Sequence, residues 1–288
     1  MKLLLDHQLI AAADAPALPL DRPGAYETLW WRRNEPVFWE DHWQRFAVAL
    51  RYFAGESPWT EPRLRDAIDT LARVNGISDG VLRYMVWREG ELPALSDPRG
   101  AGAPPPTWHS RIDLTPPRPH MAKPAFELTW ALRTVTTVAG DPTLHRFKHW
   151  SRAAWRDATE HARRAGYDDA LVLDESGAVL EAGTSNVFLV FGDELHTPAL
   201  SVRPLPGVMR QRVIGSAHEA GLVVRERRCA REEVEQAEAL WVTNSLIGIR
   251  PVKRVDNRAF QVAPPLLGRL REAWSSRYGW DPVKGGGE

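Results

Sequence analysis

Hydrophobic positions recur at two different spacings along the first half of the chain, and each spacing predicts one type of element. Apolar side chains at intervals of three and four residues over 40–53 and 62–74 predict two amphipathic helices. Short runs of apolar and β-branched residues predict four strands, at 2–5, 26–31, 81–88 and 127–138. We therefore expect helices and strands to be mixed in this region.

The second half continues with a helical pattern over 148–165, which ends at Gly166. A second helix is expected to begin at Pro206-Gly207 and to end at Gly221. Strands are expected between and after these helices, at 170–173 and 178–181 as a hairpin, then at 186–191 and 240–243.

A break at Ala139-Gly140-Asp141-Pro142 divides the two halves. It predicts a smaller α+β domain over 1–139, a linker over 140–147 and a larger domain over 148–288. The Pro- and Gly-rich segment 93–106 is expected to be a loop, and a loop of that length is often functional.

Length and composition agree with this plan and restrict the function. A chain of 288 residues with 43% hydrophobic and 26% charged residues can bury a core, and its length favours two domains. The 37 basic residues equal the 37 acidic ones, so no net charge draws the chain to nucleic acid or to an anionic membrane. The single cysteine, Cys229, forms no intrachain disulfide, and no run of eighteen apolar residues is present. We therefore expect a cytoplasmic protein.

Common catalytic templates are missing from the sequence. Neither a Walker loop nor a GxGxxG fingerprint is present, and Ser185 lacks the second glycine of a nucleophile elbow. His145 and His149 have the spacing of metal ligands but no third ligand beside them, so no metal site is expected. Lysine chemistry has few candidates, because only five of the 37 basic residues are lysines.

One stretch, from Gly166 to Phe188, carries most of the functional information. It resembles the signature of the class IV aminotransferases, the fold-type IV pyridoxal phosphate enzymes, which include the D-amino acid aminotransferases. The resemblance is strong over 148–255 and weaker toward the N-terminus. Five separate anchors occur in the order of that family: Lys148-His149, Glu181 through Asn186, Thr197-Pro198, Leu205 through Arg210, and Thr243-Asn244-Ser245 before Pro251-Val252.

The resemblance implies pyridoxal 5'-phosphate as cofactor and Lys148 as the catalytic amine that holds it as a Schiff base and later moves protons. Glu181 matches the carboxylate that keeps the pyridine nitrogen protonated. Tyr167 matches a tyrosine that reaches the phenolic oxygen of the cofactor. Without the resemblance, Lys148 would be an exposed lysine at a helix start, Glu181 an exposed glutamate of a hairpin and Tyr167 a packed amphipathic tyrosine.

The phosphate group requires donors of its own. By resemblance these are the backbone N–H groups of Val208 and Met209 at a helix N-terminus and the hydroxyl of Ser245, with Asn186 also on the cofactor side. Arg45, in the run His42-Trp43-Gln44-Arg45, matches an arginine that binds the phosphate at two points. Without the resemblance, His42 and Arg45 would be the solvated face of a helix.

The resemblance leaves the reaction open. The run Lys148-His149-Trp150-Ser151-Arg152 and Asn244 favour a lyase that converts 4-amino-4-deoxychorismate to 4-aminobenzoate and pyruvate, a step of folate biosynthesis. The alternatives are an aminotransferase for branched-chain or D-amino acids and a noncatalytic relative that binds a ligand. Tyr26 and Asn244 are expected on the substrate side, although Tyr26 could equally be a packed strand residue. The family also implies a homodimer whose partner completes the site.

Overall fold

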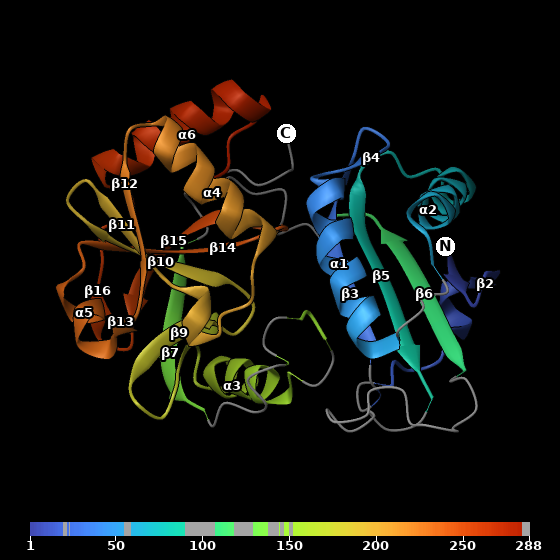
Figure 1. The fold of residues 1–288 in the computed structure, drawn as a ribbon, viewed down its shortest axis with the longest axis horizontal. Helices are drawn as coiled ribbons and strands as arrows, with labels where there is room; N and C mark the ends of the chain where they lie inside the picture. Colours follow the sequence, from blue (N-terminus) through green and yellow to red (C-terminus); the bar gives the residue numbers. More distant parts are fainter. Residues whose placement is uncertain are drawn as a thin grey trace. The chain divides into compact units, whose positions relative to one another are not determined.

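The computed structural model describes residues 1–19, 22, 24–54, 59–89, 107–117, 129–137, 144, 147–149 and 152–283, and it is drawn in Figure 1. The chain forms two compact units. One comprises Met1–Pro117 with Phe147–Ser151, and the other comprises Arg118–Arg146 with Arg152–Glu288. Each unit combines a sheet with helices, which confirms the α+β class. The Pro-rich segment 93–106 lies outside the described residues.

The first unit is built on a sheet with the strand order β2-β1-β6-β5-β3-β4. Neighbouring strands in this sheet are antiparallel. Helix α1 lies against strand β3, and Phe46, Leu50 and Phe53 on its inner face are buried, as the three- and four-residue spacing predicts (Figure 1). The elements are β1 (Lys2–Leu5), β2 (Gln8–Ala11), η1 (Ala12–Asp14), β3 (Gly24–Arg32), β4 (Glu35–Pro36), α1 (Trp39–Ala54), α2 (Glu61–Asn75), β5 (Gly80–Arg88) and β6 (Trp108–Thr115).

The second unit is built on a larger sheet with the strand order β12-β11-β10-β14-β15-β7-β8-β9-β13, and β16 pairs with β15. Helix α3 packs on β8, and α4 packs beside α6 (Figure 1). The elements are β7 (Trp130–Thr136), α3 (Ala153–Arg164), β8 (Asp169–Leu173), β9 (Ala178–Ala182), β10 (Asn186–Phe191), β11 (Glu194–Pro198), η5 (Leu200–Val202), α4 (Val208–Glu219), β12 (Val223–Arg227), β13 (Cys229–Ala230), α5 (Arg231–Gln236), β14 (Ala239–Asn244), β15 (Gly248–Val255), β16 (Arg258–Ala259) and α6 (Pro265–Tyr278).

The boundary between the units differs from the sequence prediction, which places 1–139 in one domain and 148–288 in the other. Strand β7 lies before the predicted linker, yet it pairs in parallel with β15 and with β8 of the second unit. The segment Phe147–Ser151, by contrast, belongs to the first unit. Backbone pairing decides both assignments, because a strand satisfies its N–H and C=O groups wherever its partner strands lie.

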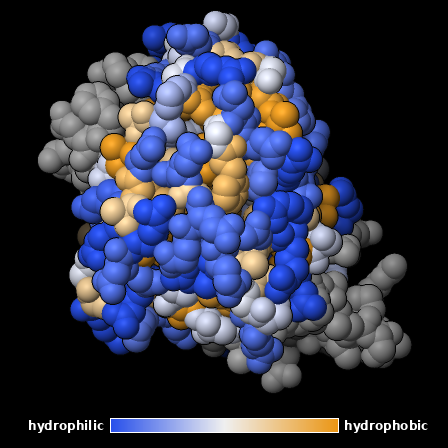
Figure 2. All heavy atoms as spheres, turned by 90° about the vertical axis from the view of Figure 1, so that its left-hand side faces the viewer, coloured by the Kyte–Doolittle hydropathy of each residue, from blue (hydrophilic) through white to orange (hydrophobic). Residues whose placement is uncertain are grey.

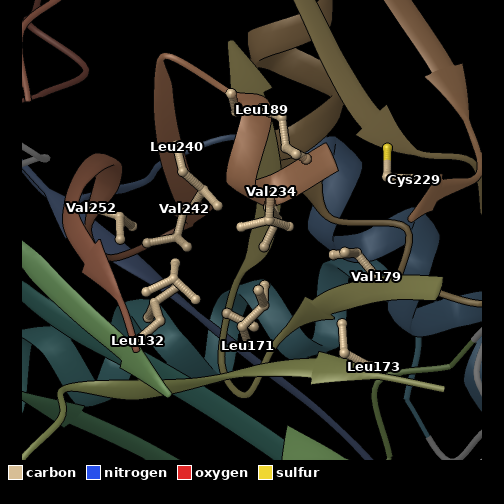
Figure 3. Packing of buried hydrophobic residues seen from close by; sticks show 14 residues of the cluster. Leu132, Leu171, Leu173, Val179, Leu189, Cys229, Val234, Leu240, Val242 and Val252 are labelled. Atoms are coloured by element: carbon tan, nitrogen blue, oxygen red, sulfur yellow. The ribbon is translucent and has the colours of Figure 1, made fainter. Parts of the chain in front are cut away.

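The hydrophobic core of the second unit is formed by side chains of its large sheet together with Val234 of α5. Leu132, Leu171, Val242 and Val252 are fully buried, and Val234 of α5 packs among them. Figure 3 shows these side chains pointing toward one another from β7, β8, β14, β15 and α5. Burial on both faces explains why strands such as β10 and β14 are continuous apolar runs in the sequence.

One face of the molecule is mixed in polarity (Figure 2). Figure 2 shows a face on which hydrophilic residues predominate and hydrophobic residues form small scattered groups. Among the described residues, no helix is both long enough and apolar enough to cross a membrane.

One predicted helix begins later than the sequence indicates. The helix expected over 148–165 starts at Ala153, with Arg152 as its N-cap. Lys148 precedes it outside any helix, and its neighbour His149 forms a β-bridge with Ala25. The helix expected after Pro206-Gly207 is confirmed as α4, which begins at Val208.

Candidate active site

Lys148 is held against strand β3 of the first unit. The backbone N–H of Tyr26 donates to the carbonyl oxygen of Lys148 at 3.1 Å. The Lys148 Nζ lies 4.9 Å from the centroid of the Tyr26 ring, a distance at which a cation is attracted to the face of an aromatic ring. The fold thus brings together two residues that the sequence proposed separately, and Lys148 is half-buried instead of being an exposed lysine at a helix start.

A buried ion pair lies on the same strand. The Glu27 carboxylate is fully buried and accepts hydrogen bonds from Arg45 Nε at 2.8 Å and Arg45 Nη2 at 2.7 Å. His42 Nδ1 lies 2.7 Å from the Glu27 Oε2 atom, and His42 is also fully buried. The alternative of a solvated helix face is therefore wrong for both His42 and Arg45, while the phosphate contact of Arg45 stays a prediction.

Electrostatics keep Glu27 ionised. Burial acts to raise the pKa of the Glu27 carboxyl, but Arg45 and His42 outweigh it and lower the pKa to about 2. Burial lowers the pKa of the His42 imidazole, against the raising influence of Glu27. The sequence analysis missed Glu27, although an acidic residue inside the apolar strand 24–32 was a usable signal, because such a residue needs a partner.

The Glu181 carboxylate lies on β9 of the second unit and is 3% exposed. One oxygen, Oε1, accepts a hydrogen bond from Arg152 Nη2. The other, Oε2, accepts from Asn186 Nδ2 at 3.2 Å and from the Leu205 N–H at 3.0 Å. The alternative of an exposed hairpin glutamate is therefore wrong, and Arg152 is a contact that the sequence analysis did not identify.

Asn186 connects this carboxylate to the N-terminus of α4. Its Nδ2 also donates to the Leu205 carbonyl oxygen at 2.8 Å. A Cβ atom on Gly207, the N-cap of α4, would lie 1.9 Å from Asn186 Oδ1, so any other residue there would force Asn186 to move. No side chain of the described residues caps this helix end, so the first backbone N–H groups, including those of Val208 and Met209, suit an anion.

A hydrogen-bonded loop joins β9 to β10 beside Glu181. The buried Asp169 carboxylate accepts hydrogen bonds from the Thr184 N–H at 3.0 Å, from the Thr184 hydroxyl at 2.7 Å and from the Thr159 hydroxyl at 2.8 Å. Burial raises the pKa of Asp169, and these hydrogen bonds act in the opposite direction. A Cβ on Gly183 would lie 1.9 Å from the Thr159 Oγ1 atom, so this loop also requires glycine.

Asn244 faces the same loop. Its Nδ2 donates to the Thr184 carbonyl oxygen at 3.2 Å and to Ser185 Oγ at 3.0 Å. Its Oδ1 accepts from the N–H groups of Leu246 and Ile247. The side chain therefore organises the turn that carries Ser245, and the substrate contact predicted for Asn244 stays a prediction.

Tyr167 belongs to the second unit. Its ring packs on the cluster around Trp155 and Ala162, and the guanidinium of Arg254 lies 4.2 Å from its centroid. These contacts match the alternative of a packed amphipathic tyrosine, and its contact with the cofactor stays a prediction.

Each unit holds its own set of candidate groups. The first holds an amine, Lys148, beside an aromatic ring and a buried Glu27–Arg45 pair. The second holds a buried carboxylate, Glu181, near an uncapped helix N-terminus. An amine suits covalent capture of a carbonyl group and proton transfer, a buried carboxylate suits a protonated ring nitrogen, and a free helix N-terminus suits a phosphate.

Known proteins are similar to this chain in sequence. The sequence profile of the family described as amino-transferase class IV matches residues 24–255. A protein of Rickettsia bellii, named a probable branched-chain-amino-acid aminotransferase, is 26% identical over 220 residues, which are 75% of this chain and 72% of that protein.

Two solved structures have the same fold. The branched-chain aminotransferase of Thermoproteus uzoniensis, solved with norvaline, has a TM-score of 0.80 at 23% identity and covers 97% of this chain and 96% of its own. A candidate 4-amino-4-deoxychorismate lyase of Legionella pneumophila has a TM-score of 0.76 at 23% identity, with 91% of this chain and 95% of its own covered.

Proposed function

The chain belongs to the amino-transferase class IV family, and from this premise we propose that it is an aminotransferase acting on branched-chain amino acids. The enzyme is pyridoxal 5'-phosphate-dependent. The observation that carries the substrate class is the similarity to the Rickettsia bellii relative over three quarters of the chain. The lyase reaction that the sequence analysis placed first has less support than this aminotransferase alternative.

The residues of the chain fit the cofactor. Glycine at 207 leaves no side chain over the start of α4, where a phosphate would accept the N–H groups of Val208 and Met209. The Glu181 carboxylate is buried and held by three hydrogen bonds, the setting required of a partner for a protonated pyridine nitrogen. Pyridoxal 5'-phosphate would supply an aldehyde for the substrate amine and a ring that accepts the electron pair left on carbon when the proton is removed.

The chain's own residues handle the proton and the charges. Lys148 Nζ would be the base that takes the proton from the amine-bearing carbon of the substrate and then the acid that delivers a proton to the aldehyde carbon of the cofactor. Glu181 keeps its negative charge buried, and Arg45 completes the phosphate contacts while it neutralises Glu27. Tyr26 lines the substrate side next to Lys148. The active form is a homodimer, which sedimentation at several protein concentrations tests.

A second candidate, the lyase for 4-amino-4-deoxychorismate, is favoured by the fold it shares with the Legionella pneumophila structure. In that reaction the same Nζ atom would protonate the carbon of the departing group, which leaves as pyruvate. The two reactions use the same cofactor residues and differ in their products.

One experiment separates the two reactions. The purified protein loaded with pyridoxal 5'-phosphate is mixed with leucine, isoleucine or valine in a single turnover, and in parallel with 4-amino-4-deoxychorismate. We expect a keto acid and pyridoxamine 5'-phosphate in equal amounts from the amino acids. Formation of pyruvate and 4-aminobenzoate, with no keto acid from any of the three amino acids, would replace the proposal with the lyase.

The covalent role of Lys148 is tested separately. Borohydride reduction of the loaded protein followed by peptide mapping should place the cofactor on the peptide that contains Lys148. Attachment to Lys123 or Lys253 would refute this assignment, and Lys148→Ala should retain no reducible adduct.

A further inference from the structure

Arg152, the N-cap of α3, is fixed on two sides. Its guanidinium carbon lies 4.7 Å from the ring centroid of Trp155, which is itself buried. Its Nη2 atom donates to the Oε1 atom of Glu181. The guanidinium is therefore seated on an aromatic face and directed at one carboxylate oxygen.

The donors to Glu181 are not equivalent. Asn186 and the Leu205 N–H are neutral and both bind Oε2. Arg152 is the charged member of the three and binds Oε1. A buried carboxylate is costly unless an opposite charge lies beside it, so Arg152 is the donor that makes the negative charge of Glu181 sustainable at 3% exposure.

One nitrogen of Arg152 lacks a hydrogen bond in the part of the chain that the structure describes. The Nε atom of Arg152 is buried and has no hydrogen-bond partner among the described residues. A buried unpaired N–H costs about 1–3 kcal/mol. The exposed pair of Arg164 with Glu160 on the same helix carries no such cost.

We infer that Arg152 is a positioning residue for the proposed reaction: it holds the Glu181 carboxylate in place and orients it toward the ring nitrogen of the cofactor. The inference rests on the proposed function, because it assigns Arg152 a role that acts through Glu181. Arg152 touches neither substrate nor reacting atoms in this scheme.

The test compares Arg152→Gln, Glu181→Gln and the double variant, with Arg164→Gln as the matched control. Arg152→Gln should lower kcat about tenfold or more and change KM by less than about threefold. Because Arg152 acts through Glu181, the double variant should be no slower than Glu181→Gln alone, and such non-additivity is the mark of two residues that work as one unit. Arg164→Gln should match the parent.

Two readouts do not depend on turnover. The visible absorption spectrum of bound pyridoxal 5'-phosphate should change in the same direction in Arg152→Gln and in Glu181→Gln, and should stay unchanged in Arg164→Gln. The rise in Tm on adding pyridoxal 5'-phosphate to the cofactor-free protein should shrink in the same two variants. Arg152→Lys keeps the positive charge, so it should restore part of kcat and part of the spectrum. This variant also tests the inference if Arg152→Gln folds poorly.

Additive losses in the double variant, or a parent-like spectrum in Arg152→Gln, would refute the inference while leaving the proposed function intact. The absence of rescue by Arg152→Lys in a folded protein would assign Arg152 a role in packing only. A parent protein that binds no pyridoxal 5'-phosphate would overturn the proposed function, and the inference with it.

Discussion

Two buried carboxylates dominate the chemistry at the scale of single residues. Glu27 and Glu181 lie in different units, and each accepts a hydrogen bond from an arginine that the sequence places on or next to a helix. Glu27 has both of its oxygens bound by Arg45, whereas Glu181 has a single charged donor on one oxygen. The first arrangement suits structural neutralisation. In the second, Oε1 of Glu181 accepts a hydrogen bond only from Arg152 among the described residues, so it can accept one more.

The role proposed for Glu181 predicts the effect of a neutral replacement. Glu181→Gln should fold and bind pyridoxal 5'-phosphate but lose about two decades or more of kcat, because an amide cannot stabilise a protonated ring nitrogen. Two decades require only about 3 kcal/mol of transition-state stabilisation. Steady-state kinetics on the loaded protein measure this loss, and turnover within a few-fold of the parent would remove Glu181 from that role.

The lowered pKa of Glu27 predicts that the folded protein loses stability in acid. Its pKa is about 2 in the folded chain against an ordinary value of 4.5, so its stabilising contribution is complete above about pH 4.5 and is lost as the pH falls toward about 2. The difference of about 2.5 units corresponds to roughly 3 kcal/mol of unfolding free energy. Urea unfolding of the parent and of Glu27→Gln at several pH values measures it.

The replacement should lower the unfolding free energy at neutral pH, because Arg45 loses its buried partner. It should also flatten the acid dependence between pH 4.5 and 2 by roughly the same 3 kcal/mol. Equal acid dependence in the two proteins would show that Glu27 does not carry this effect.

At the scale of elements, short connections between strands and helices position the side chains of the candidate site. The turn between β9 and β10 is fixed by Asp169 and Asn244, and the entry to α4 is fixed by Asn186 against Gly207. Both connections need glycine at a close approach, at Gly183 and at Gly207. The regular elements supply rigid ends, and the loops between them supply the contacting groups.

Gly207 and Gly215 offer a matched pair on the same helix. Gly207→Ala places a Cβ 1.9 Å from the Asn186 Oδ1 atom, so Asn186 must move and lose its bond to Leu205. We expect a loss of about 1–3 kcal/mol of stability and weaker retention of pyridoxal 5'-phosphate. Equilibrium unfolding and dialysis against buffer measure the two effects.

Gly215→Ala is the control. A Cβ there meets nothing within 4 Å, and α4 should gain roughly 0.5–1 kcal/mol from the better helix former. Retention of the cofactor should not change. If Gly207→Ala behaves like Gly215→Ala in both measurements, the close approach at the α4 N-terminus does not matter for the site.

At the scale of the whole molecule, the residues assigned to the cofactor belong to two compact units. Lys148, Tyr26 and Arg45 belong to the first, and Glu181 and the start of α4 belong to the second. A ligand bound by residues of both units stabilises both, because unfolding either unit then requires its release. The proposed cofactor site therefore has a thermodynamic consequence that can be measured without substrate.

Calorimetry of the cofactor-free protein should show two unfolding transitions, and pyridoxal 5'-phosphate should raise the Tm of both. In Lys148→Ala the rise should be smaller for the unit that contains this residue. A rise confined to one transition in the parent would place the whole cofactor site in a single unit and contradict the assignment of Lys148 together with Glu181.

Local patterns along the sequence determined much of the fold. The helices α1, α2 and α4 and the strands β1, β5, β8 and β10 follow from the spacing of their apolar residues, because one buried face imposes its own period. The family and the cofactor were also accessible from sequence, since the anchors from Lys148 to Ser245 are runs of adjacent residues.

Tertiary structure decided what depends on contacts between distant residues. The pairing of β7 with β8 and β15 moved the boundary between the units, and the bridge from His149 to Ala25 removed Lys148 from the predicted helix. The contacts of Arg152 with Glu181 and of Arg45 with Glu27 join residues 29 and 18 positions apart. The spacing of residues along the sequence does not predict such pairs. A charged group needs an oppositely charged partner only where it is buried, and burial exists only in the folded chain.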